Sequence, residues 1–437
     1  MTILTVSAQL ARDLEHQDKT FASAFSIMRE SIAQGAFPAA SIAVTHEGRL
    51  IALRALGRFT YEADASSFSG LREDGNLDLE VTPATLFDLA SLTKPIATTT
   101  MAAILYERGL LELDSPVVGI LPEFLADDCH ELDPRRHEVT FRMLLAHSSG
   151  LPAYEKLFLS AHSRNELLLA ALTTALSADP ATLVEYSDIG FIVLGAALER
   201  IAEEPLDAFC QREIFGPLAM THTTFNPPAG LRQQIPPTAD ERDSSRDACG
   251  AGAPARETPE ASAHSNKRST FRHKIIQGEV QDENASIMGG VAGHAGLFST
   301  AEDLAIFAHA MLQCGTGAPA REIPAPISKQ SAGGTPDHPI LRPETVALFT
   351  RRELAPPATS RALGWDTPSA PSQSGKYFGP NSYGHLGYTG TSLWIDPDRE
   401  LSIALLTNRT WPDCSNQAIK QIRPRLHDAI VEALPKT

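Results

Sequence analysis

The chain has 437 residues, 43% of them hydrophobic, which is enough to bury the core of one large two-lobed domain or of two or three smaller ones. Its formal net charge is −16 and it has no run of Lys or Arg, so a nucleic-acid or anionic-membrane partner is not expected. Small molecules, peptides or neutral polymers are better candidates for its substrate.

The N-terminus and the cysteines bear on the cellular compartment. Residues 1–21 lack a basic segment followed by an apolar core and a cleavage site, and no stretch of the chain is long and apolar enough to span a bilayer. The five cysteines are scattered, odd in number and not spaced as metal ligands. We therefore expect a cytoplasmic protein, or a periplasmic one if the N-terminus is incomplete, without a metal or other cofactor.

The N-terminal part of the chain predicts a helix followed by a hairpin. Residues 8–34 have the pattern of an amphipathic helix, and residues 40–57 form two apolar runs joined by a short polar turn. Residues 61–80 are rich in Ser, Gly, Asp and Glu and predict a surface loop. We take residues 1–19 as an N-terminal segment and residues 20–437 as one domain.

The middle of the chain, from about residue 90 to 310, predicts a helical lobe. Residues 185–199 illustrate the pattern, because Ser187 or Asp188 can cap a helix whose apolar residues recur at helical spacing. Two segments interrupt the lobe or follow it. The first is a disordered insertion at about 240–270, and the second is a Pro- and Gly-rich loop at about 315–338.

The C-terminal part changes to the period of strands. Short strands and a closing helix are predicted at 383–388, 391–395, 401–407 and 418–434. Strands at both ends of the chain with helices between them predict an α/β fold of the α+β type, in which both termini build one antiparallel sheet and a helical lobe is inserted.

A candidate nucleophile lies at the start of this lobe, in the segment FDLASLTK that ends at Lys94. Ser91 and Lys94 stand one helical turn apart, and this is the only Ser-x-x-Lys in the chain. A serine hydroxyl needs a neighbouring group to take its proton, and an amine three residues on is within reach. The start of a helix also favours an oxyanion and a lowered lysine pKa. A solvated lysine beside a helix cap is the bland alternative.

Two later segments of the chain form a set of three motifs with the Ser91 segment. Tyr186-Ser187-Asp188 and His385-Leu386-Gly387 follow Ser91-Leu-Thr-Lys94. Together they resemble the three motifs of the serine β-lactamase and penicillin-binding-protein superfamily, in particular its class C-like branch, over about residues 20–434. The resemblance implies a β-lactamase/transpeptidase-like fold and no cofactor.

The resemblance also implies roles for single residues. Ser91 would be the acyl-forming nucleophile, Lys94 its base partner and Tyr186 the phenol that passes a proton to the leaving group. The backbone N–H groups of Ser91 and Tyr388 would form the oxyanion hole. Asp188 would bind or orient the substrate, but it stands where the family usually has Asn, so an amide donor to the substrate is lost.

In the third motif, His385 and Gly387 would orient the substrate. His385 replaces a common lysine, and a histidine partly charged near pH 7 would hold a substrate carboxylate less firmly. We therefore expect β-lactam hydrolysis to be slow or absent, with muramyl-peptide amides or short acyl esters preferred.

Two further segments resemble parts of the family. Residues 147–152, HSSGLP, look structural, and the glycine-rich segment 289–299, which contains His294, would lie near the floor of the site. Asp282 and Glu283 resemble an acidic stretch of muramyl-peptide amidases, but a helix cap or a surface charge explains them equally well, so they stay outside the predicted catalytic set.

These motifs predict a serine hydrolase that forms an acyl-enzyme with an amide or ester, most plausibly a cell-wall-derived muropeptide or D-amino-acid peptide. A β-lactamase and a general carboxylesterase are alternatives, because the same acylation chemistry serves all three. A penicillin- or muropeptide-binding module without turnover is a further alternative, although a binder has no need of Lys94.

Overall fold

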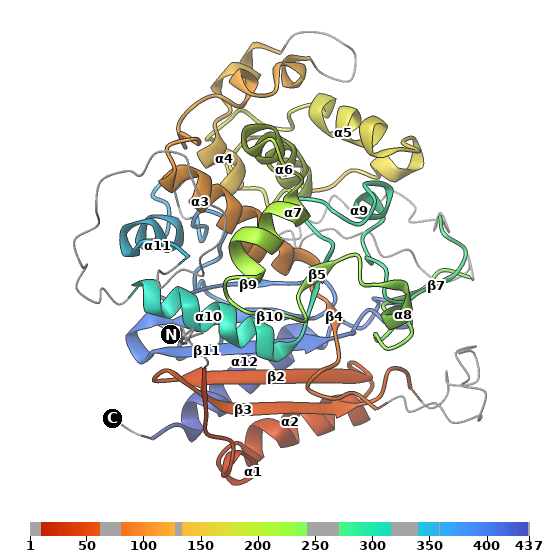
Figure 1. Ribbon diagram of the computed structural model, residues 1–437, viewed down its shortest axis with the longest axis vertical. Helices are drawn as coiled ribbons and strands as arrows, with labels where there is room; N and C mark the ends of the chain where they lie inside the picture. The colour runs from red at the N-terminus through yellow and green to blue at the C-terminus, as the bar shows by residue number, and fades with distance from the viewer. Residues whose placement is uncertain are drawn as a thin grey trace, which may run out of the picture.

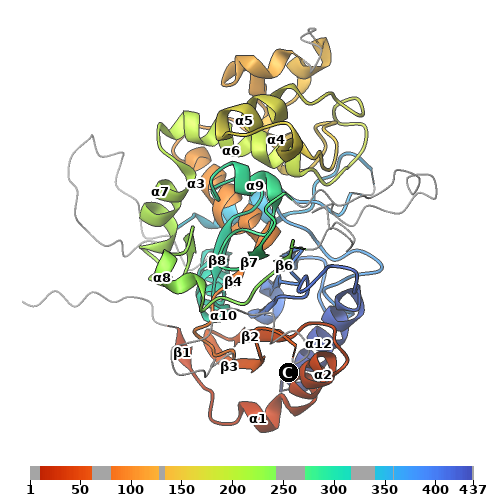
Figure 2. The ribbon, with the colours of Figure 1, turned by 90° about the vertical axis from the view of Figure 1, so that its right-hand side faces the viewer.

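The computed structural model describes residues 10–61, 80–126, 133–242, 271–315, 340–357 and 359–435. Its helical region occupies one end of the molecule and the main sheet, which has six strands, the other (Figures 1 and 2). Nearly all of the predicted insertion and of the Pro- and Gly-rich loop lies outside the described residues, as does most of the loop predicted at 61–80. Among the described residues, no helix is long and apolar enough to cross a membrane.

The main sheet combines strands from both ends of the chain. Its order is β1 (Ala11–Arg12), β3 (Arg49–Gly57), β2 (Ala39–His46), β11 (Leu401–Thr407), β10 (Ser392–Asp396) and β9 (Tyr383–Leu386). Neighbouring strands are antiparallel, except that the short edge strand β1 pairs parallel to β3. The predicted fold, with one sheet assembled from both termini, is confirmed, and β1 makes that sheet mixed.

Each face of the sheet is covered by helices. Alternate residues of β2 separate the two cores: Ile42 and Val44 belong to the core under α2 (Ala22–Ala33) and α12 (Ile419–Ala433), whereas Ala43 belongs to the core shared with α10 (Ala301–Gly315). This alternation follows from the two-residue period of a strand.

The predicted N-terminal helix is partly wrong. Residues 11–12 pair with the sheet edge as β1 instead, and a short helix α1 (Gln17–Thr20) precedes α2.

The helical region is built around α6 (Asp188–Ala202), whose residues 188–198 are all buried. Burial on every side explains why this helix is apolar almost throughout. The other helices are α3 (Thr100–Glu107), α4 (Phe141–Leu145), α5 (Arg164–Thr173), α7 (Leu206–Cys210), α8 (Ala229–Arg232), α9 (Glu283–Ile287) and α11 (Pro343–Thr350).

Two small sheets are separate from the main sheet. Strand β8 (Leu297–Ser299) lies between β4 (Phe87–Asp88) and β5 (Thr224–Phe225), and β6 (Ala239–Asp240) pairs with β7 (Ile275–Ile276). Strand β4 leads directly into the Ser91 segment.

Candidate active site

Ser91 lies on a tight turn between β4 and the helix that follows. The turn is a 3₁₀ segment, Ala90–Leu92, and the chain then passes through a π-helical turn, Lys94–Thr99, into α3. Ala90 adopts a left-handed conformation with φ of +48°, which is rare for a residue with a Cβ atom. Its N–H donates to Asp88 Oδ1 at 2.8 Å. Burial raises the pKa of Asp88 to about 6.

Lys94 is fully buried and makes three polar contacts. Its Nζ donates to Ser91 Oγ at 3.0 Å, to Asp188 Oδ1 at 2.6 Å and to the backbone oxygen of His294 at 3.1 Å. Burial alone would lower the pKa of Lys94, but the Asp188 carboxylate and Tyr186 outweigh it and raise that pKa above its ordinary value. The expected lowering of the lysine pKa by the helix start is therefore wrong, because a charged partner acts at much shorter range.

Tyr186 lies against Lys94, with the lysine Nζ 4.8 Å from the centre of its ring. Its buried hydroxyl has no hydrogen-bond partner in the described part of the chain. Burial raises the pKa of Tyr186 even though Lys94 and Ser91 act to lower it. Two imidazole rings flank the phenol, that of His147 at 4.5 Å and that of His385 at 5.7 Å between ring centres.

His147 positions the second motif, a role that the sequence analysis did not assign. Its Nδ1 accepts a hydrogen bond from the Ser187 N–H at 2.9 Å while its ring packs against Tyr186. Ser187 is the N-cap of α6, as predicted: its Oγ accepts from the Gly190 N–H and donates to the Pro152 carbonyl. The sequence signal for this role was the HSSGLP segment, because its first residue, His147, and its last, Pro152, both accept a hydrogen bond from Ser187, next to Tyr186.

His385 lies on β9 and is buried. Its Nδ1 is 2.9 Å from the Leu386 carbonyl, which can only accept, so Nδ1 carries the proton. Burial, together with the positive charges of Lys94 and Arg361, holds the pKa of His385 well below 6.5. The expected partial charge near pH 7 is therefore wrong, and the unpartnered Nε2 is an acceptor.

Gly387 allows the end of β9 to approach the Ser91 turn. A Cβ atom there would lie 1.9 Å from Thr391 Oγ1 and 2.5 Å from the Leu89 carbonyl oxygen. Two threonine hydroxyls join the segments at this point, Thr389 donating to the Asp88 carbonyl at 2.7 Å and Thr391 to the Leu89 carbonyl at 3.0 Å. The strand end and the nucleophile turn are thus held side by side.

The two N–H groups predicted for an oxyanion hole belong to these joined segments. Neither the Ser91 N–H nor the Tyr388 N–H donates to another residue that the structure describes. The carbonyl of Tyr388 accepts from Arg409 Nε at 2.8 Å, which helps to fix the orientation of that peptide. Neither donor is therefore committed to another group among the described residues.

The acidic pair beside the site has two different environments. Asp282 is a helix cap, accepting from the Ala285 N–H at 2.7 Å, and it also bonds His294 Nε2 at 2.8 Å. Although burial opposes ionisation of Asp282, His294 and these hydrogen bonds hold its pKa below its usual range. Glu283 receives a 3.5 Å hydrogen bond from the Tyr154 hydroxyl, and burial raises its pKa to about 8. Asp282 is linked to Lys94 through His294, a connection that the sequence analysis missed.

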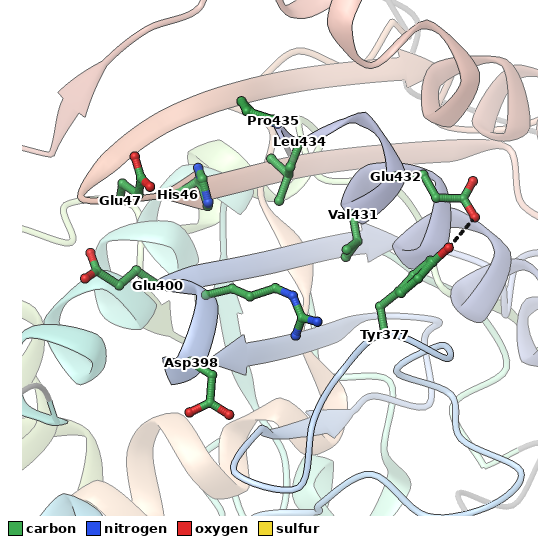
Figure 3. Close-up of a pocket in the computed structure, with 10 residues that line it drawn as sticks. His46, Glu47, Tyr377, Asp398, Glu400, Val431, Glu432, Leu434 and Pro435 are labelled. Carbon is green, nitrogen blue, oxygen red and sulfur yellow. Dashed lines mark hydrogen bonds between the residues drawn. The ribbon is translucent and has the colours of Figure 1, made fainter. Parts of the chain in front are cut away.

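A surface hollow of about 740 Å³ lies elsewhere on the main sheet (Figure 3). It is lined by residues of the β2–β3 turn, the β10–β11 turn and the end of α12, among them Glu47, Glu400 and Glu432. None of the candidate catalytic or substrate-orienting residues lines this hollow. The described residues contain no group of three His, Cys, Asp or Glu side chains placed to hold a metal ion.

Sequence and fold comparisons relate the chain to known proteins. The profile of the Beta-lactamase family matches residues 24–423. The chain belongs to the Beta-lactamase family. An N-acetylmuramyl-L-alanine amidase of Bacillus subtilis is 30% identical over 88% of this chain and 79% of its own length. A putative D-alanyl-D-alanine carboxypeptidase of Escherichia coli K12 is 30% identical over 77% of this chain and 73% of its own.

Solved structures show that the similarity of this Beta-lactamase family member to known proteins includes its fold. EstCE1, described as a hydrolase with promiscuous acyltransferase activity, superposes with a TM-score of 0.64 at 21% identity, covering 94% of this chain and 99% of its own. With its family and relatives, the chain is a serine hydrolase of the β-lactamase and penicillin-binding-protein type.

Proposed function

We propose that this hydrolase cleaves an amide bond in cell-wall-derived muropeptides or D-amino-acid peptides through an acyl-enzyme on Ser91. The observation that carries the mechanism is the 3.0 Å contact between Nζ of the buried Lys94 and Oγ of the partly buried Ser91. The choice of substrate is supported by the similarity to an N-acetylmuramyl-L-alanine amidase over 88% of this chain.

The proton balance of the first step involves Lys94 and Tyr186. A protonated Lys94 donates to Ser91 Oγ and cannot accept its proton, so the reactive form has lost one proton from this pair. In that form the Ser91 proton moves to Lys94 as Oγ attacks the carbonyl carbon. Tyr186 then protonates the departing nitrogen, the C–N bond breaks, and water later hydrolyses the ester.

The backbone N–H groups of Ser91 and Tyr388 would stabilise the oxyanion, and donors of this kind are typically worth about 3 kcal/mol each. His385 would accept a hydrogen bond through Nε2. We further propose a cytoplasmic setting, in which the substrates are recycled wall fragments.

The test compares kcat/KM for N-acetylmuramyl-L-alanine, a D-Ala-D-Ala peptide, a p-nitrophenyl ester and a chromogenic cephalosporin. We expect one of the two amides to be preferred and the cephalosporin to be slow. A cephalosporin value far above the others, within the ~10⁴–10⁸ M⁻¹s⁻¹ of efficient enzymes, would identify a β-lactamase instead.

The matched variant is Ser91→Ala, with the exposed Ser160→Ala as control. Intact-mass measurement should show an acyl adduct on the wild type and on Ser160→Ala but none on Ser91→Ala. Unchanged turnover by folded Ser91→Ala would refute the mechanism.

A further inference from the structure

The backbone carbonyl of His294 completes the set of groups around the lysine of the site. Lys94 Nζ lies 3.0 Å from Ser91 Oγ, 2.6 Å from Asp188 Oδ1 and 3.1 Å from the His294 carbonyl oxygen. A carboxylate oxygen and a carbonyl oxygen only accept hydrogen bonds, whereas a serine hydroxyl can also donate one. The three contacts of Lys94 are therefore not equivalent.

This difference matters in the reactive form of the site, in which Lys94 is a neutral amine with two N–H groups and one lone pair. Asp188 and the His294 carbonyl accept from the two N–H groups, so the lone pair is left for the Ser91 hydroxyl. The proton of Ser91 Oγ then moves directly to Lys94 Nζ as Oγ attacks. Without the His294 carbonyl, the amine is free to rotate about its Cε–Nζ bond and its lone pair has no fixed direction.

The peptide that carries this carbonyl has little backbone support. The Gly293 carbonyl accepts from Thr98 Oγ1 at 2.7 Å, which fixes the peptide before His294 but not the one after it. Neither the His294 N–H nor the Ala295 N–H donates to another residue within the described ranges. Gly296 follows with a φ of +120°, a conformation that depends on the freedom of glycine. The orientation of the His294 carbonyl therefore needs another anchor.

The side chain of His294 provides that anchor. It is buried, and its Nε2 lies 2.8 Å from Asp282 Oδ1, which as part of a carboxylate accepts, so Nε2 carries a proton. Asp282 Oδ1 also accepts from the Ala285 N–H as the cap of α9. That cap does not require a charge, since Ser, Thr and Asn cap helices as well. Although burial opposes ionisation of Asp282, its pKa is lowered by His294 and by the charge of Lys94.

We propose that the buried Asp282–His294 pair positions the base of the reaction: it holds the His294 carbonyl against Lys94 and thereby directs the lone pair of Lys94 at Ser91 Oγ. Both are positioning residues, because they act through Lys94 rather than on the substrate. This inference rests on the proposed acyl-enzyme mechanism, but it does not depend on which amide or ester is cleaved.

The test uses variants that keep the size of a side chain and remove the contact between the pair. His294→Leu has no donor for Asp282, whereas His294→Gln can place an amide N–H where Nε2 lies. Asp282→Ser keeps a hydroxyl that can cap α9 but is one bond too short to reach His294. The control is His309→Leu, which replaces a partly buried histidine of α10.

The measurement is single-turnover release of p-nitrophenol from p-nitrophenyl acetate, with enzyme in excess. The limiting rate constant reports acylation, and the enzyme concentration that gives half of it reports binding. We expect His294→Leu and Asp282→Ser to lower the limiting rate constant by about 10- to 100-fold, because a misplacement of about 1 Å can cost about 100-fold. Binding should change by less than about threefold. His294→Gln should recover most of the loss, and His309→Leu should match the wild type.

Urea unfolding of each variant separates positioning from a purely structural role, because a structural defect lowers stability without changing the rate constant of each folded molecule. A wild-type limiting rate constant in folded His294→Leu would overturn the inference. His294→Gln as slow as His294→Leu would overturn it as well, since the donor to Asp282 would then not matter. If His294→Leu does not fold, Asp282→Ser decides by the same criterion.

The outcomes also separate this inference from the proposed function. Acylation that depends on the pair with p-nitrophenyl acetate, without cleavage of N-acetylmuramyl-L-alanine or of the D-Ala-D-Ala peptide, supports the inference and refutes the proposed substrates. Release of p-nitrophenol by Ser91→Ala at the wild-type rate would refute the acyl-enzyme mechanism and the inference with it.

Discussion

Lys94 Nζ and Asp188 Oδ1 lie 2.6 Å apart, with both side chains buried. This ion pair keeps the lysine protonated at neutral pH, because the carboxylate outweighs the effect of burial on the lysine pKa. With an uncharged amide at position 188, no carboxylate would counteract the lowering of the Lys94 pKa by burial. The Asp at this position therefore shifts the reactive form of the site toward alkaline pH.

Asp188→Asn should lower the pKa of Lys94 and move the acidic limb of the kcat/KM profile to lower pH. The measurement is that profile for p-nitrophenyl acetate, with Asp207→Asn, in the first turn of α7, as control. Breaking a buried ion pair typically costs about 3–5 kcal/mol, so unfolding is followed in parallel. An acidic limb that stays in place or moves upward would contradict the argument.

Lys94→Ala and Tyr186→Phe should each lower kcat by about 10²–10⁴-fold, since both residues act in one proton transfer. Tyr186→Phe keeps the ring that packs on His147 and removes only a hydroxyl without a partner. The double variant should lose much less than the product of the two losses. Full multiplicativity in kcat would mean that the two side chains act independently.

Gly387→Ala should displace the end of β9 from the Ser91 turn, because its Cβ would meet the Leu89 carbonyl oxygen at 2.5 Å. A shift of this kind typically costs about 100-fold in rate, and crowding a packed site about 1–3 kcal/mol. Gly119→Ala is the control, since nothing lies within 4 Å of a Cβ there. Wild-type kcat in Gly387→Ala would show that the close approach is not needed.

Asp88→Asn tests the buried carboxyl that holds the nucleophile turn. The pKa of folded Asp88, about 6, lies above its ordinary 3.8, so the folded protein binds this proton more tightly and wild-type stability falls as pH rises from about 4 to about 6. A pKa rise of this size corresponds to about 3 kcal/mol. The unfolding free energy of Asp88→Asn relative to wild type should therefore increase by that amount between about pH 4 and pH 7.

Urea unfolding at both pH values provides this measurement. The variant has one side-chain oxygen and keeps only one of the two hydrogen bonds that the Asp88 carboxylate accepts, from the Ala90 and Gln281 N–H groups. These bonds favour the ionised form and are already part of the pKa shift, so they need no separate correction. The same difference in stability at both pH values would mean that Asp88 is ionised throughout.

Local patterns predicted much of the fold. The hairpin of β2 and β3, the C-terminal strands and the Ser187 cap depend on residues close in sequence, where periodicity and side-chain chemistry act directly. The strand β1 was not predictable in this way, because two residues pair with an edge that only the folded sheet provides.

The proximity of the candidate site residues was predictable, but their electrostatics were not. Motif spacing predicted Ser91, Lys94 and Tyr186 as site residues, and the structure brings these three side chains together around the buried Lys94. The protonation of Lys94 and the neutrality of His385 depend on burial and on charges brought together by folding. Arg361 carries no local signal, because it reaches the site through a turn paired with β9.

The threonine hydroxyls that join residues 389 and 391 to the turn before Ser91 span about three hundred positions of the chain. The central pairing of β2 with β11 spans even more. Such non-local contacts form late and slowly in folding. During synthesis, a nascent chain that ends before residue 401 contains Ser91 and Lys94 but lacks β11, which joins β10 and β9 to β2. We therefore expect hydrolytic competence only after translation has passed this strand.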